Sequence, residues 1–321
     1  MRKIRYSRLP TERSNPASRR LDRLTPLAIA RLMNRADRGA VRAVGRAAAP
    51  LARAVELTAR ALARGGRLVF VGAGTSGRLG VLEAAECPPT FGTPPALVQA
   101  VMAGGRPSVF RAKEGAEDDA ADGARQVRRR ARRGDVVVGV AASGVTPFVR
   151  GALAEARRRG AATVLVTCNP GISRSAARVV VPLAVGPEIL AGSTRLKAGT
   201  ATKLALNTLT TAVFVRLGKV YGNRMVDLLP RSGKLRARAA ALVGELGRVS
   251  PRDARRLLAA AGGRAKLAIV MARLGVDRRE AARRLAAAHE FLGRALTHKA
   301  GGRSGGNLAF RPTRAHGREP V

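Results

Sequence analysis

The sequence contains no tryptophan, and aromatic residues of all kinds make up only 3% of its 321 residues. Apolar residues still account for 46%, so we expect a core built from alanine, leucine and valine rather than from large rings. Cysteine is almost as scarce. Cys87 and Cys168 are too few for a disulfide framework, which is typical of the reducing cytosol, and we predict a cytoplasmic protein.

Long apolar segments are missing as well. No run of about 18 apolar residues occurs, so we expect no membrane span. Residues 1–6 carry charge but no apolar stretch, so we expect no signal peptide. All three histidines (His289, His298 and His316) lie towards the C-terminal end, so neither a Cys–His nucleophile nor a histidine metal site is expected.

Acidic residues are few beside the basic ones. The 21 Asp and Glu stand against 60 Lys and Arg, which gives a formal charge of +39. One interpretation is contact with nucleic-acid phosphates; the other is a solvated surface in which arginine has replaced other polar residues. The second is favoured, because no helix-turn-helix, zinc-finger or base-stacking pattern accompanies the basic residues. We expect no specific nucleic-acid partner.

The apolar pattern predicts an α/β fold with a doubly wound parallel sheet, N-terminal helices and a small helical C-terminal domain. Short apolar runs that indicate strands alternate with segments that indicate helices. One of these helices begins near Ser76 and is expected to stop before Pro88 and Pro89. The expected strands are 67–71, 96–102, 135–141, 163–168 and 179–183.

The same patterns divide the chain into four parts. An N-terminal helical segment covers 1–54, and the α/β domain covers 55–225. Residues 226–298 are predicted to form a small helical bundle, and the Gly-, Arg- and Pro-rich stretch 299–321 is expected to be disordered. The helices of the bundle are expected near 235–247, 251–261, 264–274 and 278–296.

The strongest local signal is the glycine-rich loop 72–77, which follows the first strand and opens a helix. It matches the G-x-G-x-x-G pattern of dinucleotide-binding folds, but no Asp or Glu ends the second strand, where such folds hold the ribose. Gly74, Thr75 and Ser76 instead offer two hydroxyls beside free backbone N–H groups at a helix N-terminus, which suits a phosphate dianion. A tight turn capped by Ser76 would produce the same pattern.

A second loop with the same chemistry follows the third strand. Ser143 and Thr146 can direct hydroxyls at an anion, and Gly144 permits a close backbone approach. Two such loops at the carboxyl ends of parallel strands predict a ligand crevice, and since neither has the lysine of a P-loop, a phosphosugar is favoured over ATP. Ser193 and Lys197, in a turn before a later helix, are expected to line the same pocket, although a plain helix cap would explain them nearly as well.

Two groups of carboxylates are candidates for chemistry. Glu86 is expected at the C-terminal end of the helix after the glycine-rich loop, where the helix dipole disfavours a negative charge. Glu114, Glu117, Asp118 and Asp119 form an acidic cluster in a chain rich in arginine. A solvated helix N-terminus, or ion pairs with that arginine, would explain the cluster without any function.

Together these motifs resemble the signature of the N-acetylmuramic acid 6-phosphate etherases. The resemblance covers about residues 8–297, and its motifs are long and specific. The matching segments are 11–16, 72–80, 86–92, 103–105, 114–118, 141–144, 168–170, 192–200 and 218–223.

The resemblance implies a sugar-isomerase (SIS) domain, a helical C-terminal domain and a homodimer, with no cofactor or metal. It implies cleavage of the D-lactyl ether of N-acetylmuramic acid 6-phosphate to N-acetylglucosamine 6-phosphate and D-lactate, by elimination and water addition, in cell-wall amino-sugar recycling. It assigns Glu86 as the acid and Glu117 as the base. An ideal helix would separate Glu86 from Ser76 by roughly 15 Å, so the helix must bend or end early, or Glu86 must serve a pocket completed by the partner subunit.

Two positions depart from the family pattern. Val145 stands where the family has an arginine, and Gly233 stands where it has a glutamate. Two alternatives share the fold, namely a phosphosugar-binding regulator without chemistry and a phosphosugar isomerase. The presence of both Glu86 and Glu117 favours the enzyme over the regulator, and an isomerase needs one base between C1 and C2 rather than an acid directed at C3.

Overall fold

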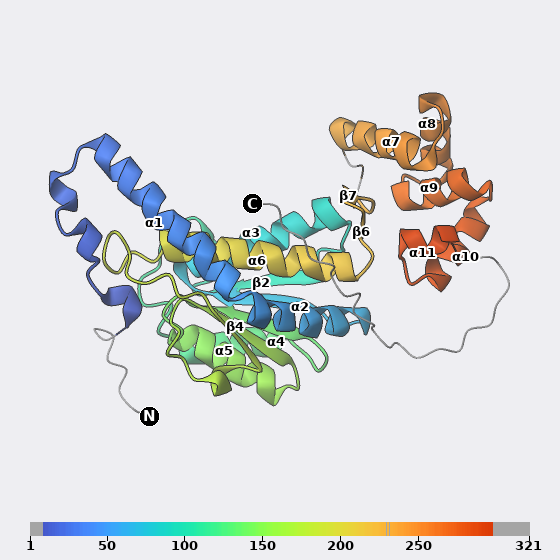
Figure 1. The fold of residues 1–321 in the computed structure, drawn as a ribbon. Helices are drawn as coiled ribbons and strands as arrows, with labels where there is room; N and C mark the ends of the chain where they lie inside the picture. Colours follow the sequence, from blue (N-terminus) through green and yellow to red (C-terminus); the bar gives the residue numbers. More distant parts are fainter. Residues whose placement is uncertain (1–8, 229, 231, 298–321) are drawn as a thin grey trace.

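The computed structural model describes residues 9–228, 230 and 232–297. Its centre is a five-stranded parallel sheet in the order β2-β1-β3-β4-β5, with helices on both faces (Figure 1). The predicted fold class is confirmed, and each expected strand is found within two residues of its expected bounds. The strands are β1 (Leu68–Gly72), β2 (Val98–Met102), β3 (Val136–Val140), β4 (Ala162–Thr167) and β5 (Val179–Pro182).

The central strands β1 and β3 are buried along their whole length. Parallel strands covered by helices on both faces carry continuous apolar sequence, and this is why the valine-rich runs predicted them. Leu68 of β1 pairs with Val98 of β2 and with Val136 of β3. From β1 the chain passes to β2 on one side of β1 and then to β3 on the other side. The strand order therefore reverses between β1 and β3. Open α/β sheets bind ligands at the carboxyl ends of strands beside such a reversal.

Six helices cover the sheet: α1 (Pro26–Arg46), α2 (Ala48–Ala63), α3 (Gly74–Phe91), α4 (Ala120–Arg130), α5 (Pro147–Arg158) and α6 (Lys197–Arg216). Alternate side chains of each strand enter opposite cores. Leu68 and Phe70 pack in the core with α1, α2, α3 and α6. Val69 and Val71 pack in the other core with α4 and α5. The two layers of helices leave only the ends of the parallel strands open for a site.

Helix α3 does not stop where its sequence predicts. It runs through Pro88 and Pro89 to Phe91, so the expected early end is wrong. A proline in a helix costs a backbone hydrogen bond, but tertiary packing holds this last turn. Cys87 and Phe91 are buried, and the Phe91 ring stacks on Phe214 of α6 with 4.6 Å between the ring centroids. As a result Glu86 lies more than a turn before the end of α3 rather than in its last turn.

The C-terminal helices form a bundle with a core of their own (Figure 1). The single helix expected at 278–296 is two, because His289 and Glu290 adopt positive φ angles of 52° and 66° and break it. A short hairpin that the sequence did not predict, β6 (Val220–Tyr221) with β7 (Arg224–Met225), precedes the bundle. The bundle helices are α7 (Gly233–Gly247), α8 (Pro251–Ala260), α9 (Ala265–Leu274), α10 (Arg278–Ala287) and α11 (Leu292–Thr297). The tail predicted at 299–321 lies outside the described residues.

A buried lysine connects the bundle to the end of α6. The Lys266 ammonium, on α9, donates to Asp227 Oδ2 at 2.6 Å and to the carbonyl oxygens of Gly218 and Glu290 at 3.0 Å each. Its three donors are thus all used. Because Gly218 follows α6 directly, this buried ammonium fixes the bundle against the α/β domain, and removing one member of such a set is costly.

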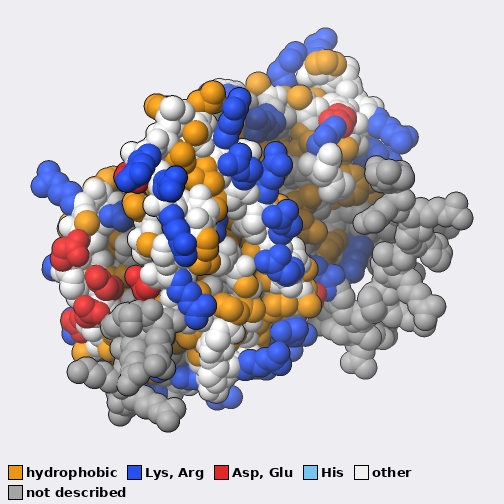
Figure 2. Space-filling model, turned by 60° about the vertical axis from the view of Figure 1, so that its left-hand side comes forward, with side chains coloured by type: hydrophobic (Ala, Val, Ile, Leu, Met, Phe, Trp, Pro, Cys, Tyr) orange, Lys and Arg blue, Asp and Glu red, His pale blue; other side chains and the backbone are white. Residues whose placement is uncertain are grey.

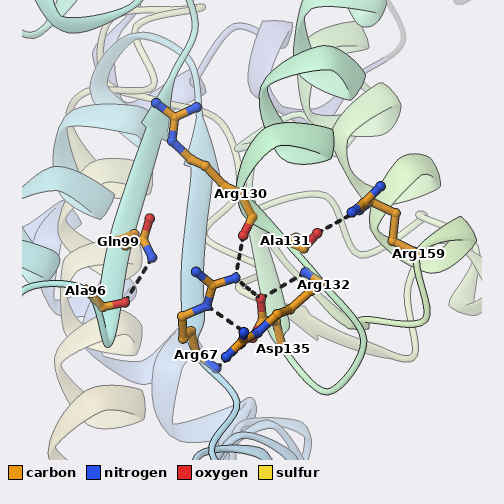
Figure 3. A network of polar contacts seen from close by, with 8 residues as sticks. All are labelled: Arg67, Ala96, Gln99, Arg130, Ala131, Arg132, Asp135 and Arg159. Atoms are coloured by element: carbon orange, nitrogen blue, oxygen red, sulfur yellow. Dashed lines mark hydrogen bonds and ion pairs between the residues drawn. The ribbon is translucent and has the colours of Figure 1, made fainter.

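A second buried network closes the amino end of the sheet, opposite the expected site (Figure 3). The Asp135 carboxylate, fully buried, accepts from the backbone N–H groups of Arg67 and Arg132 at 2.9 Å each. It also pairs with Arg67 Nη2 at 2.8 Å, and the same nitrogen donates to the Arg130 carbonyl. Arg67 and Asp135 directly precede β1 and β3, so the network holds these two neighbouring strands in register.

On the face drawn in Figure 2, Lys and Arg side chains are scattered over much of the surface, while most of the Asp and Glu side chains in view gather near one edge and a few lie elsewhere. That dispersal is what a solvated basic surface would produce, and it does not outline one continuous basic groove on this face. Within the described part of the chain, no helix combines the length and apolar character needed to cross a membrane.

Candidate active site

A cavity of about 410 Å³ lies at the carboxyl ends of β1 and β3, beside the reversal of strand order. The two predicted hydroxyl loops contribute Gly74, Thr75 and Ser76 after β1, and Ser143 and Thr146 after β3. The loops are far apart in the sequence and meet because parallel strands end at one edge of the sheet. The position matches the crevice in which open α/β sheets bind ligands.

The first loop depends on a close approach of backbone to backbone. A Cβ atom on Gly72 would lie 2.7 Å from the Gly77 nitrogen, and one on Gly77 would lie 2.6 Å from the Gly72 oxygen, so neither position accepts a side chain. This contact lets α3 begin directly after β1. The helix is preceded by Ala73, which makes no side-chain cap. Ser76 therefore does not cap α3, and the first N–H groups of this helix remain available to an anion in the cavity.

Two hydrogen bonds fix the second loop. The Asn169 side chain donates to the Ser143 carbonyl at 3.0 Å, and the Ser143 hydroxyl accepts from the Val145 N–H at 3.3 Å. Thr146 precedes α5 without a side-chain cap, which leaves its hydroxyl free to face the cavity. Gly144 is buried and does not line the cavity. The departure from the family pattern, Val145, is half-buried in the same loop.

Glu117 lies in the cavity wall, on the segment between β2 and α4. Its carbonyl oxygen accepts from the Phe148 N–H at 2.9 Å, which fixes this segment against the first turn of α5. Glu114 and Asp118 also line the cavity. Asp119 does not, and its carboxylate caps α4 by accepting from the Asp122 N–H at 2.7 Å. The acidic cluster is thus divided between one helix cap and three carboxylates at the cavity.

Glu86 does not line this cavity. It is exposed and borders a second cavity of about 360 Å³ between α3 and α6, together with Glu83, Lys203 and Thr210. Since α3 does not end before Glu86, an early end of the helix cannot bring this carboxylate to the first cavity. Within one described chain, the two predicted catalytic residues Glu86 and Glu117 lie in different cavities.

The second cavity contains a buried carboxylate. Thr210 Oγ1 donates to Glu83 Oε2 at 2.7 Å, and the Asn207 amide, turned with its nitrogen towards Glu83, donates to Oε1 and accepts from the Lys203 ammonium. Burial raises the pKa of Glu83 above its ordinary value, although the Thr210 hydrogen bond and Lys203 act against the rise and Glu86 adds to it. The fold therefore disfavours the ionised form of Glu83 relative to the unfolded chain.

This shift predicts the pH dependence of a variant. A carboxyl group whose pKa is higher in the folded state costs no stability below its unfolded pKa of about 4.3, and costs progressively more as the pH rises through the folded value. Glu83→Gln should therefore raise Tm at pH 7–8, with a gain that shrinks towards pH 4. Thermal unfolding across this range measures it. A gain that is constant with pH, or largest in acid, would contradict the assignment.

Ser193 and Lys197 were expected at the same pocket, but neither lines the described cavity, although Gly192 and Thr194 on either side of Ser193 do. The Lys197 side chain is buried, and its ammonium donates to the Val185 carbonyl at 3.0 Å. Burial lowers the pKa of Lys197, and Glu188 acts in the opposite direction. The hydrogen bond to Val185 turns the Lys197 ammonium to the loop before α6.

Several residues of the cavity were not predicted from the sequence. Thr11 and Glu12 reach it from the N-terminal segment, because the Thr11 carbonyl accepts from the Gly192 N–H at 3.1 Å and holds this segment against the loop before α6. Thr11 and Glu12 belong to a motif of the resemblance, which was the only available signal. Ser108 and Lys113 also line the cavity, and no pattern in the sequence indicated them.

Comparison with known proteins agrees with this geometry. Residues 50–157 match the family model of the glucokinase regulatory protein N-terminal SIS domain. This match and the cavity at the strand ends define the central part of the chain as a SIS domain.

The N-acetylmuramic acid 6-phosphate etherase of Trichormus variabilis is 52% identical over 284 residues, which cover 88% of this chain and 92% of the relative. The etherase of Synechocystis sp. is 50% identical over 265 residues, which cover 82% of this chain and 87% of the relative. The chain belongs to the N-acetylmuramic acid 6-phosphate etherase family. The resemblance inferred from its motifs is confirmed, and so is the expected class of enzyme, a lyase that cleaves an ether.

Proposed function

We propose that this protein cleaves the D-lactyl ether of N-acetylmuramic acid 6-phosphate and releases N-acetylglucosamine 6-phosphate and D-lactate, as a step of cell-wall amino-sugar recycling. One observation carries the proposal: the cavity at the reversal of strand order joins two hydroxyl-rich helix N-termini to Glu117, in a chain about half identical to etherases over most of its length. The helix N-termini supply phosphate recognition, and the carboxylate supplies a base.

The phosphate of the substrate fits the loops after β1 and β3. The N-termini of α3 and α5 both open to the cavity, and their partial positive charge favours a dianion. Thr75, Ser76, Ser143 and Thr146 add hydroxyl donors. This arrangement binds a phosphate without a metal ion or a P-loop lysine.

The chemistry needs one base and one acid. Ring opening turns C1 into an aldehyde, which acidifies the proton on C2. Glu117 takes this proton, the electron pair forms the C2–C3 double bond, and the bond from C3 to the lactyl oxygen breaks. Glu86 gives its proton to the departing oxygen, and water then adds at C3. Each proton transfer contributes about 10²–10⁴ in rate. In this proposal the acid that acts in the cavity is supplied by the partner subunit of a homodimer, because Glu86 of the same chain borders a different cavity.

The proposal is tested by incubating the purified protein with N-acetylmuramic acid 6-phosphate and measuring D-lactate with a D-lactate dehydrogenase. Release of stoichiometric D-lactate is expected. A phosphosugar-binding regulator would bind the substrate without releasing lactate. An isomerase would interconvert aldose and ketose phosphates and leave the ether intact. Either result would reject the etherase.

The hydroxyl loops give a prediction about binding. Ser76→Ala and Ser143→Ala each remove one hydrogen bond to a charged group, which costs about 1.5–3 kcal/mol. We expect KM for the substrate to rise by about 10- to 100-fold in each variant, with kcat less affected. Steady-state kinetics measure this, and Ser193→Ala is the control, because Ser193 does not line the described cavity although its neighbours Gly192 and Thr194 do. An unchanged KM in both variants would reject these loops as the phosphate site.

A further inference from the structure

One residue of the cavity wall carries a hydroxyl that is buried and lacks a partner among the described residues. Ser108 lies in η5 (Arg106–Val109), the short 3-10 helix after β2, where 4% of its surface is exposed and it lines the cavity wall. Its Oγ has no hydrogen-bond partner among the described residues. A buried hydroxyl without a partner costs stability, so such groups in folded proteins usually serve a ligand, a water or a strained function.

Hydrogen bonds from Arg78 of α3 fix the turn that carries Ser108. Arg78 Nε donates to the Val109 carbonyl at 2.7 Å, and Arg78 Nη2 donates to the Ser108 carbonyl at 2.9 Å. The Ser108 N–H donates to the Gly105 carbonyl at 3.1 Å. The backbone around Ser108 is thus held by three hydrogen bonds while its hydroxyl is left free. Such a group is preorganised for a partner that is not among the described residues.

The surroundings of the hydroxyl identify the kind of partner. Gly104, with φ of +75°, packs directly against this hydroxyl, since a Cβ there would overlap the Ser108 Oγ and lie 3.1 Å from the Lys113 Cδ and 3.3 Å from the Ala116 Cβ. Ser108 therefore lies against the segment that carries Glu114 and Glu117, both of which line the cavity. Lys113 on the same segment also lines the cavity, and this mixture of one cation with the two carboxylates suits a neutral polar group better than a phosphate dianion.

We infer that Ser108 is a substrate-binding residue whose hydroxyl bonds a neutral polar group of the bound sugar, a ring hydroxyl or the amide, on the side of the cavity away from the Ser143 loop. The inference rests on the proposed function, because it takes the substrate to be a phosphosugar held at the helix N-termini. The sheet order supports the placement: β2, which Ser108 follows, and β3, which Ser143 follows, lie on opposite sides of β1. A sugar whose phosphate lies at the loops after β1 and β3 can extend towards Ser108.

Ser108→Ala tests the inference, because a structural and a functional role predict opposite results. Removing a hydroxyl that has no partner among the described residues should leave Tm unchanged or raise it. If the hydroxyl bonds the sugar, kcat/KM for D-lactate release should fall about tenfold or more, because a polar group of the substrate then stays unpaired in the cavity. The binding constant for N-acetylglucosamine 6-phosphate, measured by calorimetry, should weaken in the same direction.

Thr93→Val is the matched control. Thr93 is 2% exposed, its Oγ1 also lacks a partner among the described residues, and it does not line the cavity. We expect this variant to keep or raise Tm with wild-type kcat/KM. The two variants share the loss of a buried hydroxyl without a partner among the described residues, and they differ in whether the residue that carries it lines the cavity.

The outcomes separate the two proposals. If the wild-type protein releases D-lactate and Ser108→Ala does so with wild-type kcat/KM, the inference about Ser108 is overturned and the etherase stands. A lower kcat/KM that follows a lower Tm would also overturn it, since the hydroxyl would then be structural. If the wild-type protein releases no D-lactate, the etherase fails, and Ser108 is judged by binding of N-acetylglucosamine 6-phosphate: weaker binding by Ser108→Ala supports it, and equal or absent binding by both proteins rejects it.

Discussion

Replacement of Glu117 by glutamine is expected to abolish both D-lactate release and the exchange of the substrate's C2 proton with solvent, whereas Glu86→Gln is expected to abolish only the release. The order of the chemistry is the reason. The C2 proton can leave and return while the ether is intact, but the ether cannot break by elimination until that proton has left. A base is needed for both processes and the leaving-group acid for one. Each loss should amount to about 10²–10⁴ in rate.

Exchange is followed by NMR of the C2 position in deuterated water, in parallel with the D-lactate assay. Glu114→Gln is the matched control, because Glu114 lines the same cavity as Glu117 and has no role in the proposed chemistry. It should retain both processes. If exchange persists in Glu117→Gln, the base is another carboxylate. If exchange is lost in Glu86→Gln, Glu86 has a role beyond protonating the leaving oxygen.

The sheet could be predicted from the sequence because its strands are covered on both faces. Continuous runs of valine such as that of β3 have no other stable place in a chain of this size. The end of α3 could not be predicted. The rule that proline ends a helix considers only neighbouring residues, whereas the contact that overrides it here joins residues far apart in the sequence. Phe91 is far in sequence from Phe214, and their stacking holds the last turn of α3 after both prolines.

The site was predictable only where its residues belong to the loops that follow strands. Ser76 and Ser143 could be paired from the sequence, because parallel strands end at one edge. Lys197, the first residue of α6, shows the limit of the same reasoning. Its ammonium donates to the Val185 carbonyl in the loop before the helix, and the residue does not line the cavity. Ser108 shows the reverse. Nothing in its local sequence marks it, and its significance comes from the absence of a partner for its hydroxyl among the described residues.

The separation of Glu86 from the first cavity leads to the second prediction. Glu117 and Glu86 border different cavities of one chain, and α3 runs on beyond Glu86. If both carboxyl groups act on one substrate, the simplest arrangement is a homodimer in which each pocket takes Glu117 from one subunit and Glu86 from its partner. Leu82, one turn before Glu86 and 42% exposed, would then be covered by the partner.

Mixing Glu86→Gln with Glu117→Gln protein under conditions of subunit exchange should therefore restore activity. In a mixed dimer with shared pockets, one pocket has both variant residues and the other has both native glutamates. Random exchange makes half of the dimers mixed, so about a quarter of the wild-type D-lactate release is expected.

Exchange itself is verified by native mass spectrometry of differently tagged subunits. The control mixes Glu86→Gln with the double variant Glu86→Gln/Glu117→Gln, which contains no intact pocket under any arrangement and should stay inactive. If the verified mixed dimer of the single variants also stays inactive, each pocket draws both residues from one chain. In that case α3 must bend on substrate binding to bring Glu86 to Glu117, because the helix does not end early enough to do so.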